Sequence, residues 1–420
     1  MMKIRQKQGL WGWVLCTLSI LIASLGLSAC GTQDTPVPVN VVKAPPTILL
    51  KEEPSDLTTL KALEVNLSTT IGLLEKNQID EAKIAFKKFD NRWFDILVIV
   101  RVYSKDAFHQ MDSNVSLLER KFLRSNAVSI SEILPMVKQL DQDLIDVIKL
   151  VPNSNSPSQF SRKVQPLTVE EVELTSSKVR EHLFNKTELL VQKGLALRDA
   201  IKTRDIKKTQ LAYEQARFEF EEIEFLAEAF KDYDIALDGR PEQMVKGELD
   251  PNWTGFHTLE KAIYQDGRLD DRLDTLADSL VQDLKNFQSE LEVSGLMITP
   301  SLAITGAASL IEEILSNKIT GEEERYSHTD LNDFKANLEG SLFVYSIFRS
   351  YVGRANPELD TLIMERFSIV QNDINPFFSA DNRALNYSQV NAATRKQLAQ
   401  KVEGLADVFS QVPGTLGLKT

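Results

Sequence analysis

The helical character of this 420-residue chain is clearest in Ile206-Lys-Lys-Thr-Gln-Leu-Ala-Tyr-Glu-Gln-Ala-Arg-Phe-Glu-Phe-Glu-Glu-Ile223. Tyr213, Ala216 and Phe220 recur there at spacings of three and four residues. Residues with this spacing share one face of an α-helix, so the row predicts a helix with one buried side. The same spacing recurs along most of the chain, which contains only 18 glycines. The sequence therefore predicts an all-α fold.

The predicted helices form two groups on either side of a polar, proline-containing linker at 152–168. The first group is a smaller antiparallel bundle over 57–151, with predicted helices at 57–76, 79–103, 106–124 and 130–150. The second group covers 169–420, with predicted helices at 169–201, 205–232, 252–265, 268–292, 300–317, 328–352, 357–374 and 386–410. Eight helices are too many for one four-helix core, so we expect a bilobal domain of two four-helix bundles.

The N-terminal segment 1–30 has the pattern of a bacterial lipoprotein signal peptide. Three basic residues precede an apolar run from Leu10 to Leu27, and Ser-Ala-Cys30 follows. We expect Cys30 to be lipidated and to become the first residue of the mature protein. The alternative is a transmembrane anchor with an incidental cysteine. The proline-rich stretch 31–56 then predicts an extended tether between membrane and folded part.

Charge and cysteine content narrow the class of function. The chain carries 60 acidic and 48 basic residues, a net charge of -12. Such a surface repels nucleic acid and anionic lipid and attracts cations, so no nucleic-acid partner is expected. Loss of the signal would remove Cys16 and leave only Cys30. This excludes an internal disulfide, a thiol nucleophile and a zinc–thiolate site.

A pair of chemically distinctive residues lies in the predicted helix 252–265. His257 is one of only four histidines and precedes Glu260 by three residues, so both side chains lie on one helix face and can reach one ion. Three further acids complete a candidate set of ligands: Glu221, Glu224 and Asp238. Carboxylates with an imidazole and no thiolate suit iron, manganese, zinc or calcium.

Each part of this set also has a simpler interpretation. His257 by itself is typical of a histidine at the edge of a core, hydrogen-bonded to one carboxylate. Glu221 and Glu224 are equally compatible with a solvated face on which they pair with Arg217 or with lysines. The residues alone leave both interpretations open.

The third unusual segment, 318–331, combines four acids with an arginine, a tyrosine and a histidine before a predicted helix. Taken alone it is a polar loop with a helix-capping signal. Taken with the other two segments, it offers a second shell or further ligands. The candidates there are Glu324, His328 and Asp330.

A resemblance to the imelysin family is carried by four segments in the order found in that family: 212–224, 232–240, 255–261 and 319–331. They look like the corresponding segments of the EfeO/EfeM-type components of ferrous-iron uptake. The resemblance covers roughly 169–420 and implies a bilobal helical domain with a metal site around the His-x-x-Glu motif. Its implied ligands are Glu221, Glu224, Asp238, His257 and Glu260, while Glu324, His328 and Asp330 are further candidates.

Two departures from the family pattern stand out. Some members of this type begin with a cupredoxin domain, whereas 57–151 is predicted to be helical and offers no copper ligands. That module instead looks somewhat like a helical extracytoplasmic domain of some iron permeases. Where relatives usually read Asp-Ala-Arg, this chain reads Asp238-Gly-Arg240, which removes no implied ligand.

The function that the resemblance implies is iron capture in an EfeUOB-like ferrous-iron uptake system. We expect an exported, lipid-anchored protein, periplasmic or on the cell surface, that binds Fe2+ or Fe3+ and passes it to an inner-membrane permease. No catalytic residue is expected, since the chain has no His-Glu-x-x-His, phosphate loop or Gly-x-Ser-x-Gly. The alternatives are a metallopeptidase that uses the His-x-x-Glu motif and a calcium-dependent protein that binds acidic polysaccharide.

Overall fold

The computed structural model of this chain describes residues 56–125, 127–151, 164–228, 230–293, 298–380 and 382–418. The predicted signal 1–30 with Cys30, nearly all of the tether 31–56 and most of the linker 152–168 lie outside these residues. Within the described residues the regular elements are all helical, apart from one isolated bridge between Phe378 and Ala384. The all-α prediction is confirmed.

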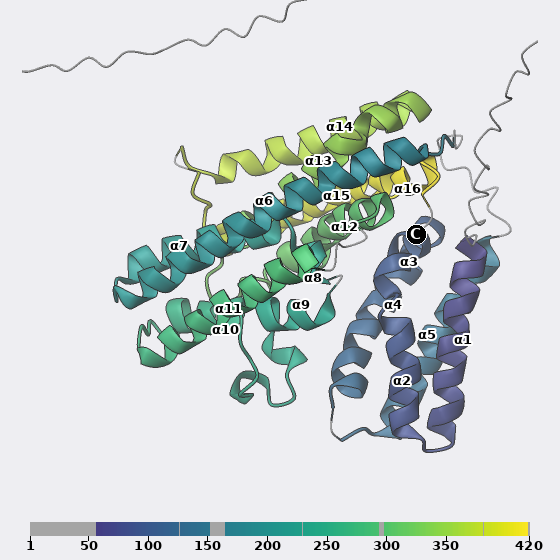
Figure 1. Cartoon of the computed structure of the whole chain (residues 1–420), viewed down its shortest axis with the longest axis horizontal. Helices are drawn as coiled ribbons and strands as arrows, with labels where there is room; N and C mark the ends of the chain where they lie inside the picture. The colour runs from purple at the N-terminus through teal and green to yellow at the C-terminus, as the bar shows by residue number, and fades with distance from the viewer. Residues whose placement is uncertain are drawn as a thin grey trace, which may run out of the picture. The chain divides into compact units, whose positions relative to one another are not determined.

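The first five helices pack against one another as the N-terminal bundle (Figure 1). Their bounds are α1 Asp56–Glu75, α2 Ile79–Asp90, α3 Trp93–Tyr103, α4 Lys105–Leu118 with a π-helical turn η1 Glu119–Leu123, and α5 Ile130–Leu150. Every third or fourth residue of α1 is buried, as its leucine row predicts. The predicted helix 79–103 is two helices, because the chain turns at Asn91-Arg92. Asparagine favours helix ends, since its side chain competes for backbone hydrogen bonds.

The helices that follow Thr168 form a first lobe around the long helix α6, Val169–Lys202, which packs against α7, Ile206–Glu221, and α11, Asp271–Val293. A capping box between Thr168 and Glu171 starts α6. Gly194 lets α11 approach closely, because a Cβ there would contact the Leu284 side chain. Three short helices lie between α7 and α11: α8 Glu224–Glu228, α9 Lys231–Asp238 and α10 Phe256–Glu260.

The second lobe consists of the remaining helices: α12 to α15 each pack on the next in sequence, and the short α16 packs on α12 and α13. They are α12 Pro300–Glu313 with a π-helical turn η6 Ile314–Lys318, α13 Asp330–Ala355, α14 Pro357–Ile374, α15 Ala392–Phe409 and α16 Val412–Thr415. Tyr345, Phe367 and Phe409 form an aromatic cluster in its core. Since α13 also contacts α6 and α7, the two lobes share one continuous core, consistent with the bilobal prediction.

The predicted helix 205–232 differs from the structure in a way that matters for the site. Helix α7 ends at Glu221, and α8 begins only at Glu224. At the turn between them the carbonyl oxygen of Glu222 lies against Gly340 of α13, where a Cβ would overlap with it. The close approach of α13 therefore accommodates the interrupted helix. The carboxylates of Glu221 and Glu224 end up near each other and near Asp238 at the end of α9.

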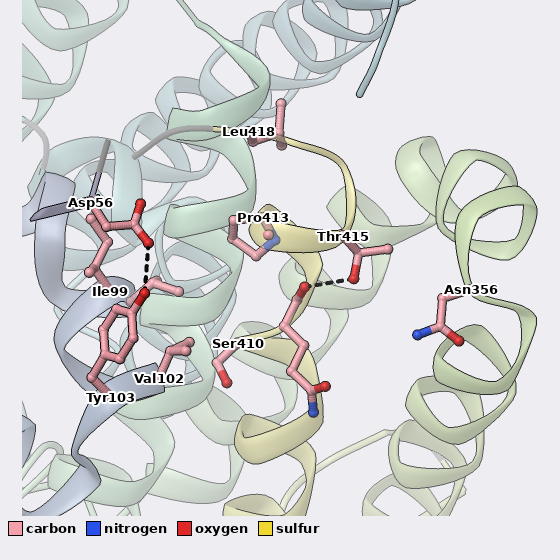
Figure 2. Close-up of a pocket in the computed structure, with 12 residues that line it drawn as sticks. Asp56, Ile99, Val102, Tyr103, Asn356, Ser410, Pro413, Thr415 and Leu418 are labelled. Atoms are coloured by element: carbon pink, nitrogen blue, oxygen red, sulfur yellow. Dashed lines mark hydrogen bonds between the residues drawn. The ribbon is translucent and has the colours of Figure 1, made fainter. Parts of the chain in front are cut away.

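The N-terminal bundle contacts the second lobe at two places. Arg101 of α3 is buried, and its guanidinium lies 2.9 Å from Glu312 of α12 and 3.1 Å from both Glu403 and Asp407 of α15. A cavity of about 60 Å³ lies further along, lined by residues of α1, α3 and the segment 410–418 (Figure 2). This cavity contains no residue of the candidate metal groups described below.

None of the helices in the described part of the chain is both long and apolar enough to cross a membrane. The predicted division into an N-terminal module, a linker and a metal-binding domain stays a prediction.

Candidate metal centre

The predicted metal-binding residues lie where the two lobes meet. The carboxyl end of α7 brings Glu221, α8 brings Glu224 and α9 ends with Asp238. Helix α10 carries His257 and Glu260. The loop between η6 and α13 closes the site from the other lobe. All five predicted side chains are buried, although each belongs to a residue type that is rarely buried without partners.

The position of His257 depends on the backbone that precedes α10. Gly255 has φ 83°, and a Cβ at this residue would overlap with the carbonyl oxygen of Leu237. Glycine alone accepts both conditions, so the chain passes directly over the end of α9. The indole of Trp253 donates a hydrogen bond of 2.8 Å to the carbonyl of Gly239 and secures this crossing. His257 is thereby placed next to Asp238.

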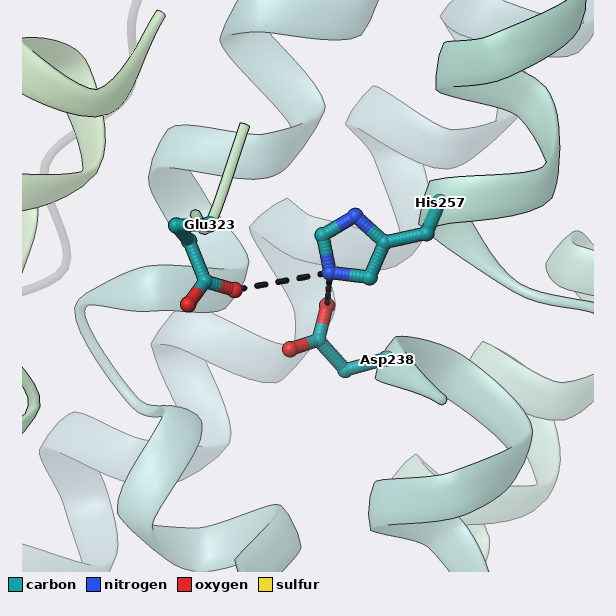
Figure 3. A group of neighbouring side chains, drawn as sticks. All are labelled: Asp238, His257 and Glu323. Atoms are coloured by element: carbon teal, nitrogen blue, oxygen red, sulfur yellow. Dashed lines mark ion pairs between the residues drawn. The ribbon is translucent and has the colours of Figure 1, made fainter. Parts of the chain in front are cut away.

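The two ring nitrogens of His257 have different surroundings. Its Nδ1 lies 3.1 Å from Glu260 Oε2. Its Nε2 points between Asp238 and Glu323, 3.4 Å from one carboxylate oxygen of each, and makes no hydrogen bond (Figure 3). Glu260 is itself held, since its Oε1 accepts hydrogen bonds of 2.8 Å from the backbone amides of Tyr326 and Ser327. A carboxylate on Nδ1 that orients the ring and leaves Nε2 available is the arrangement of many metal-bound histidines.

Three overlapping groups of side chains have ligand atoms within 4.8 Å of one another. The first is Asp238, His257 and Glu323; the second is His257, Glu260 and Glu324; the third is Glu221, Glu224, Asp238 and Glu323. Together these seven residues form what we call the acidic cluster. His257, Asp238 and Glu323 each belong to two of the groups, so the cluster is one continuous set of donors.

Two buried cations lie inside the acidic cluster. The guanidinium of Arg217 contacts Asp238, Glu221 and Glu323, and stacks between the rings of Phe220 and Phe256. Lys318, at the end of η6, is also fully buried. Its ammonium lies within 3.1 to 3.4 Å of carboxylate oxygens on three members of the cluster, Glu221, Glu224 and Glu323. Arg240 adds a third cation on the outer oxygen of Glu323.

Neutral hydrogen-bond donors surround the carboxylates of the acidic cluster. The side-chain amide of Asn337 donates to the Glu221 and Glu224 carboxylates at 2.9 and 3.3 Å. The hydroxyl of Tyr213 donates to Glu324 at 3.0 Å, and the Ser327 hydroxyl donates to the other oxygen of that carboxylate. These bonds fix the carboxylates in place. Glu221 Oε1 nevertheless makes no hydrogen bond, although it contacts Arg217.

Burial shifts the protonation equilibria of the acidic cluster. It raises the pKa of Glu221 and Glu324 to about 8 and that of Glu224 to about 7. Burial acts on the pKa of His257 in the lowering direction, but the Asp238 carboxylate and the hydrogen bond to Glu260 outweigh it and raise this pKa to about 10. Burial also opposes ionisation of Glu323, yet Arg240 and Lys318 hold its pKa well below the ordinary value.

The charge balance of the acidic cluster fits a multivalent cation. The cluster contains six carboxylates. Three permanent cations, Arg217, Arg240 and Lys318, contact them, and His257, with its pKa raised to about 10, adds a fourth positive charge, which leaves two negative charges without a partner. Buried charge without a partner is costly, so either protons or a bound cation must neutralise this excess. Carboxylate oxygens together with one imidazole nitrogen are ligands that suit iron or manganese. Zinc would be bound by a smaller number of these carboxylates.

The structure therefore brings together the five predicted ligands, Glu221, Glu224, Asp238, His257 and Glu260, and adds Glu324. The other two candidates lie apart from the three groups. His328 is half-buried with φ 58°, and its backbone bonds to Glu324 and Tyr387. Asp330 lies in the first turn of α13 and accepts the backbone amide of Glu324 at 3.2 Å.

Sequence reasoning missed three participants: Glu323, Lys318 and the buried role of Arg217. Glu323 belongs to the run Glu322-Glu-Glu324, and an irregular loop has no periodicity that shows which of the three faces inward. Arg217 does pair with Glu221, as the simpler interpretation expected. The expectation that this pair lies on a solvated face was wrong, because the side chains of Arg217 and Glu221 are completely buried.

Comparisons with known proteins bear on the same part of the chain. The model of the family described as Imelysin matches residues 180–412. The chain is 38% identical to the iron uptake system component EfeO of Escherichia coli O1:K1 / APEC. It is 37% identical to the proteins of that name in Escherichia coli strain K12 and in Shigella flexneri. Each alignment covers 239 residues, 57% of this chain and 63% of the relative, so less than two thirds of the relative is spanned.

Proposed function

This chain belongs to the imelysin family, and on that premise we propose that its acidic cluster captures iron and releases it to a membrane permease. The relatives that it matches are named as components of iron uptake. Their name supports a role in binding and transfer, with iron as the cargo. Fe2+ and Fe3+ are both candidates, because carboxylate and imidazole donors accept either oxidation state.

The observation that carries this proposal is the environment of His257 Nε2. A buried ring nitrogen without a hydrogen bond is rare, and here it points at two carboxylate oxygens, one of Asp238 and one of Glu323, which both accept hydrogen bonds from Arg217. A cation between Nε2, Asp238 and Glu323 would give this nitrogen a partner and would share the two carboxylates with Arg217. We therefore assign these residues as ligands, with Glu221 and Glu224 as the further oxygen donors of the adjoining group.

Glu260 has a different role in this assignment. Both of its oxygens are occupied, one by two backbone amides and the other by His257 Nδ1. When a metal displaces the second proton of the imidazole, Glu260 keeps the remaining proton on Nδ1, so that Nε2 is the nitrogen that binds the metal. The His-x-x-Glu motif then supplies one ligand and its support.

The cellular setting is part of the same proposal. We propose that the protein is exported and anchored through a lipid on Cys30, either in the periplasm or at the cell surface. Its partner would be a ferrous-iron permease of the inner membrane. Ligands that are mostly carboxylates suit a carrier, since affinity then depends on protonation and the ion is exchangeable. A carrier of this kind needs no catalytic residue.

The test is a titration of Fe2+ under anaerobic conditions, by calorimetry, into isosteric variants. Asp238→Asn and Glu323→Gln should each weaken binding by about 10- to 100-fold or more, and His257→Ala with Glu260→Ala should abolish it. Matched controls are Glu365→Gln on the exposed side of α14 and His328→Asn, because asparagine tolerates positive φ. Both controls should bind iron as the wild type does.

Unchanged iron affinity in the His257/Glu260 double variant would show that the ligands lie elsewhere. Incubation of the metal-loaded protein with unfolded casein separates the carrier from a metallopeptidase. Proteolysis that is lost in Glu260→Gln would favour the peptidase and contradict our assignment. Binding of acidic polysaccharide that disappears with a calcium chelator would favour the third function.

A further inference from the structure

The acidic cluster is buried, so an ion needs a route to it. The remaining exposure of the proposed ligands is uneven. Glu221 and Glu323 are completely buried and His257 is 2% exposed, whereas Glu224 and Asp238 retain 4% and 6%. The cluster thus opens towards solvent on the side of Glu224 and Asp238.

A cavity of about 680 Å³ meets the cluster on that side. Glu224 and Asp238 form part of its wall, together with residues of η6 and of the 3-10 turn η3, Pro241–Gln243. The opposite wall belongs to the N-terminal bundle, where α4 and η1 contribute Asp112, Ser116 and Glu119. At about 30 Å³ per water molecule, this volume holds roughly 20 waters, enough for a hydrated ion to enter.

The charge of the cavity wall has the sign that a cation requires. Nine of the lining residues are Asp or Glu and only three are Arg. A cleft with an excess of one charge concentrates ions of the opposite charge and raises their association rate by about 10- to 1,000-fold. Acidic residues of the N-terminal bundle, Asp112 and Glu119, thus line the same cavity as Glu224 and Asp238.

Glu312 gives a second and independent indication of a ligand in this cavity. It lines the wall, is 8% exposed, and has one oxygen, Oε2, without a hydrogen-bond partner. Its other oxygen contacts Arg101 of the N-terminal bundle. A buried carboxylate oxygen without a partner is costly unless something in the cavity binds it. Burial raises the pKa of Glu312 to about 8, which agrees with an incompletely satisfied carboxylate.

We propose that this cavity is the port through which a hydrated iron cation reaches and leaves the acidic cluster, with α4 and η1 as its outer wall and Glu312 as a carboxylate that meets the ion on the way. The inference rests on the proposed function. It also assigns a role to the N-terminal bundle, which has no ligand in the cluster but covers the way into it.

Substitutions in a port and substitutions of ligands change different quantities. Obstruction of the port slows association and dissociation of the ion by the same factor, so the dissociation constant stays constant. Loss of a ligand changes the dissociation constant itself. Kinetics therefore distinguish the two roles, provided that release and affinity are measured on the same protein.

The test places a bulky side chain in the port. Ser116 of α4 is exposed and lines the cavity, whereas Gln110 is exposed on the same helix and does not. Ser116→Trp should slow release of Fe2+ to an excess of a chromophoric ferrous chelator by at least about tenfold, with the equilibrium dissociation constant within about twofold of wild type. Gln110→Trp, the matched control, should change neither quantity.

The charge of the port is tested with Glu312→Gln, which keeps the size of the side chain. Association of Fe2+ should slow by up to about threefold to tenfold, the effect should grow as pH rises towards 8 and more of Glu312 is ionised, and the difference from wild type should shrink at high salt. Circular dichroism checks that both variants are folded. The Ser116→Trp result stands separately, because that residue lies on the surface.

Equal release rates in Ser116→Trp and Gln110→Trp would overturn the port, while wild-type iron binding would leave the proposed function intact. A larger dissociation constant with an unchanged release rate in Ser116→Trp would also overturn the port, since the substitution would then disturb the ligands. Failure of the wild type to bind iron would reject the proposed function and the port together.

Discussion

At the scale of single residues, Lys318 is the side chain that most affects the balance within the acidic cluster. Its ammonium occupies the space between Glu221, Glu224 and Glu323, where it neutralises charge as a metal ion would. A buried cation among carboxylates stabilises the metal-free fold and competes with a second cation for the same oxygens. Lys318 therefore favours a carrier that can also release its ion.

Lys318→Met should change stability and affinity in opposite directions. The metal-free protein should lose about 3 kcal/mol in the free energy of unfolding, because buried carboxylates lose their counter-ion. Iron should bind about tenfold more tightly, because the ion no longer competes with the ammonium. Urea unfolding and anaerobic titration measure the two effects. Lys207→Met, on the exposed side of α7, is the control and should change neither.

Protonation of the same residues predicts the pH dependence of iron binding. Burial raises the pKa of Glu221 to about 8 and of Glu224 to about 7, so near neutral pH both carry protons part of the time. Iron must displace these protons, and its affinity should therefore rise as pH increases from 6 to 8. Calorimetry in buffers of different ionisation enthalpy should detect proton release. An affinity independent of pH would contradict this assignment of ligands.

At the scale of elements, the interruption between α7 and α8 is the feature that assembles the site. In a continuous helix Glu221 and Glu224, three residues apart, would share one face of that helix. The structure instead turns at Glu222, where the backbone of α13 approaches at Gly340. Asn337, one turn before Gly340 on α13, then reaches both carboxylates. The packing of α13 against α7 thus also positions the carboxylates of Glu221 and Glu224.

Gly340→Ala tests this arrangement, because the new Cβ would overlap with the carbonyl oxygen of Glu222. Forced separation of α7 and α13 should lower the free energy of unfolding by about 1 to 3 kcal/mol and weaken iron binding. Gly353→Ala is the matched control on the same helix. Its Cβ would lie 3.7 Å from Asp360 Oδ2, an ordinary contact, so stability should stay the same or rise by up to about 1 kcal/mol. Equal behaviour of the two variants would show that the close approach is unimportant.

At the scale of the whole molecule, the N-terminal bundle and the second lobe are connected through Arg101. This buried guanidinium contacts three carboxylates on two helices of the other lobe, Glu312, Glu403 and Asp407. It fixes α3, and with it α4 and η1, over the cavity that leads to the acidic cluster. If the cavity is the proposed port, this connection is the means by which the N-terminal bundle would influence metal exchange.

Arg101→Met should lower the free energy of unfolding by about 3 kcal/mol, since Glu312 would remain buried without its partner. Release of Fe2+ should become faster, because the outer wall of the port is less firmly held. Lys88→Met, exposed on α2 of the same bundle, should leave stability and release unchanged. Urea unfolding and transfer to a ferrous chelator are the measurements. Slower release would contradict the role of Arg101 in holding the port.

Much of the fold could be predicted, because local periodicity marks helices directly. The recurrence of apolar residues located nearly every helix, and the number of helices led to two lobes. The prediction erred at 91–92 and 222–223, where helices that looked continuous are interrupted. The second interruption accompanies contact with α13, which is more than a hundred residues away, and no local pattern reports such a contact.

The sequence by itself determined the helices, the acidic character of the chain and the pairing of His257 with Glu260, because all three depend on composition or on residues within one helical turn. Only the tertiary structure decided that Glu323 faces inward, that Lys318 and Arg217 are buried among the carboxylates, and that residues of the N-terminal bundle line the same cavity as Glu224 and Asp238. The physical reason is that burial and charge neutralisation arise where distant segments meet.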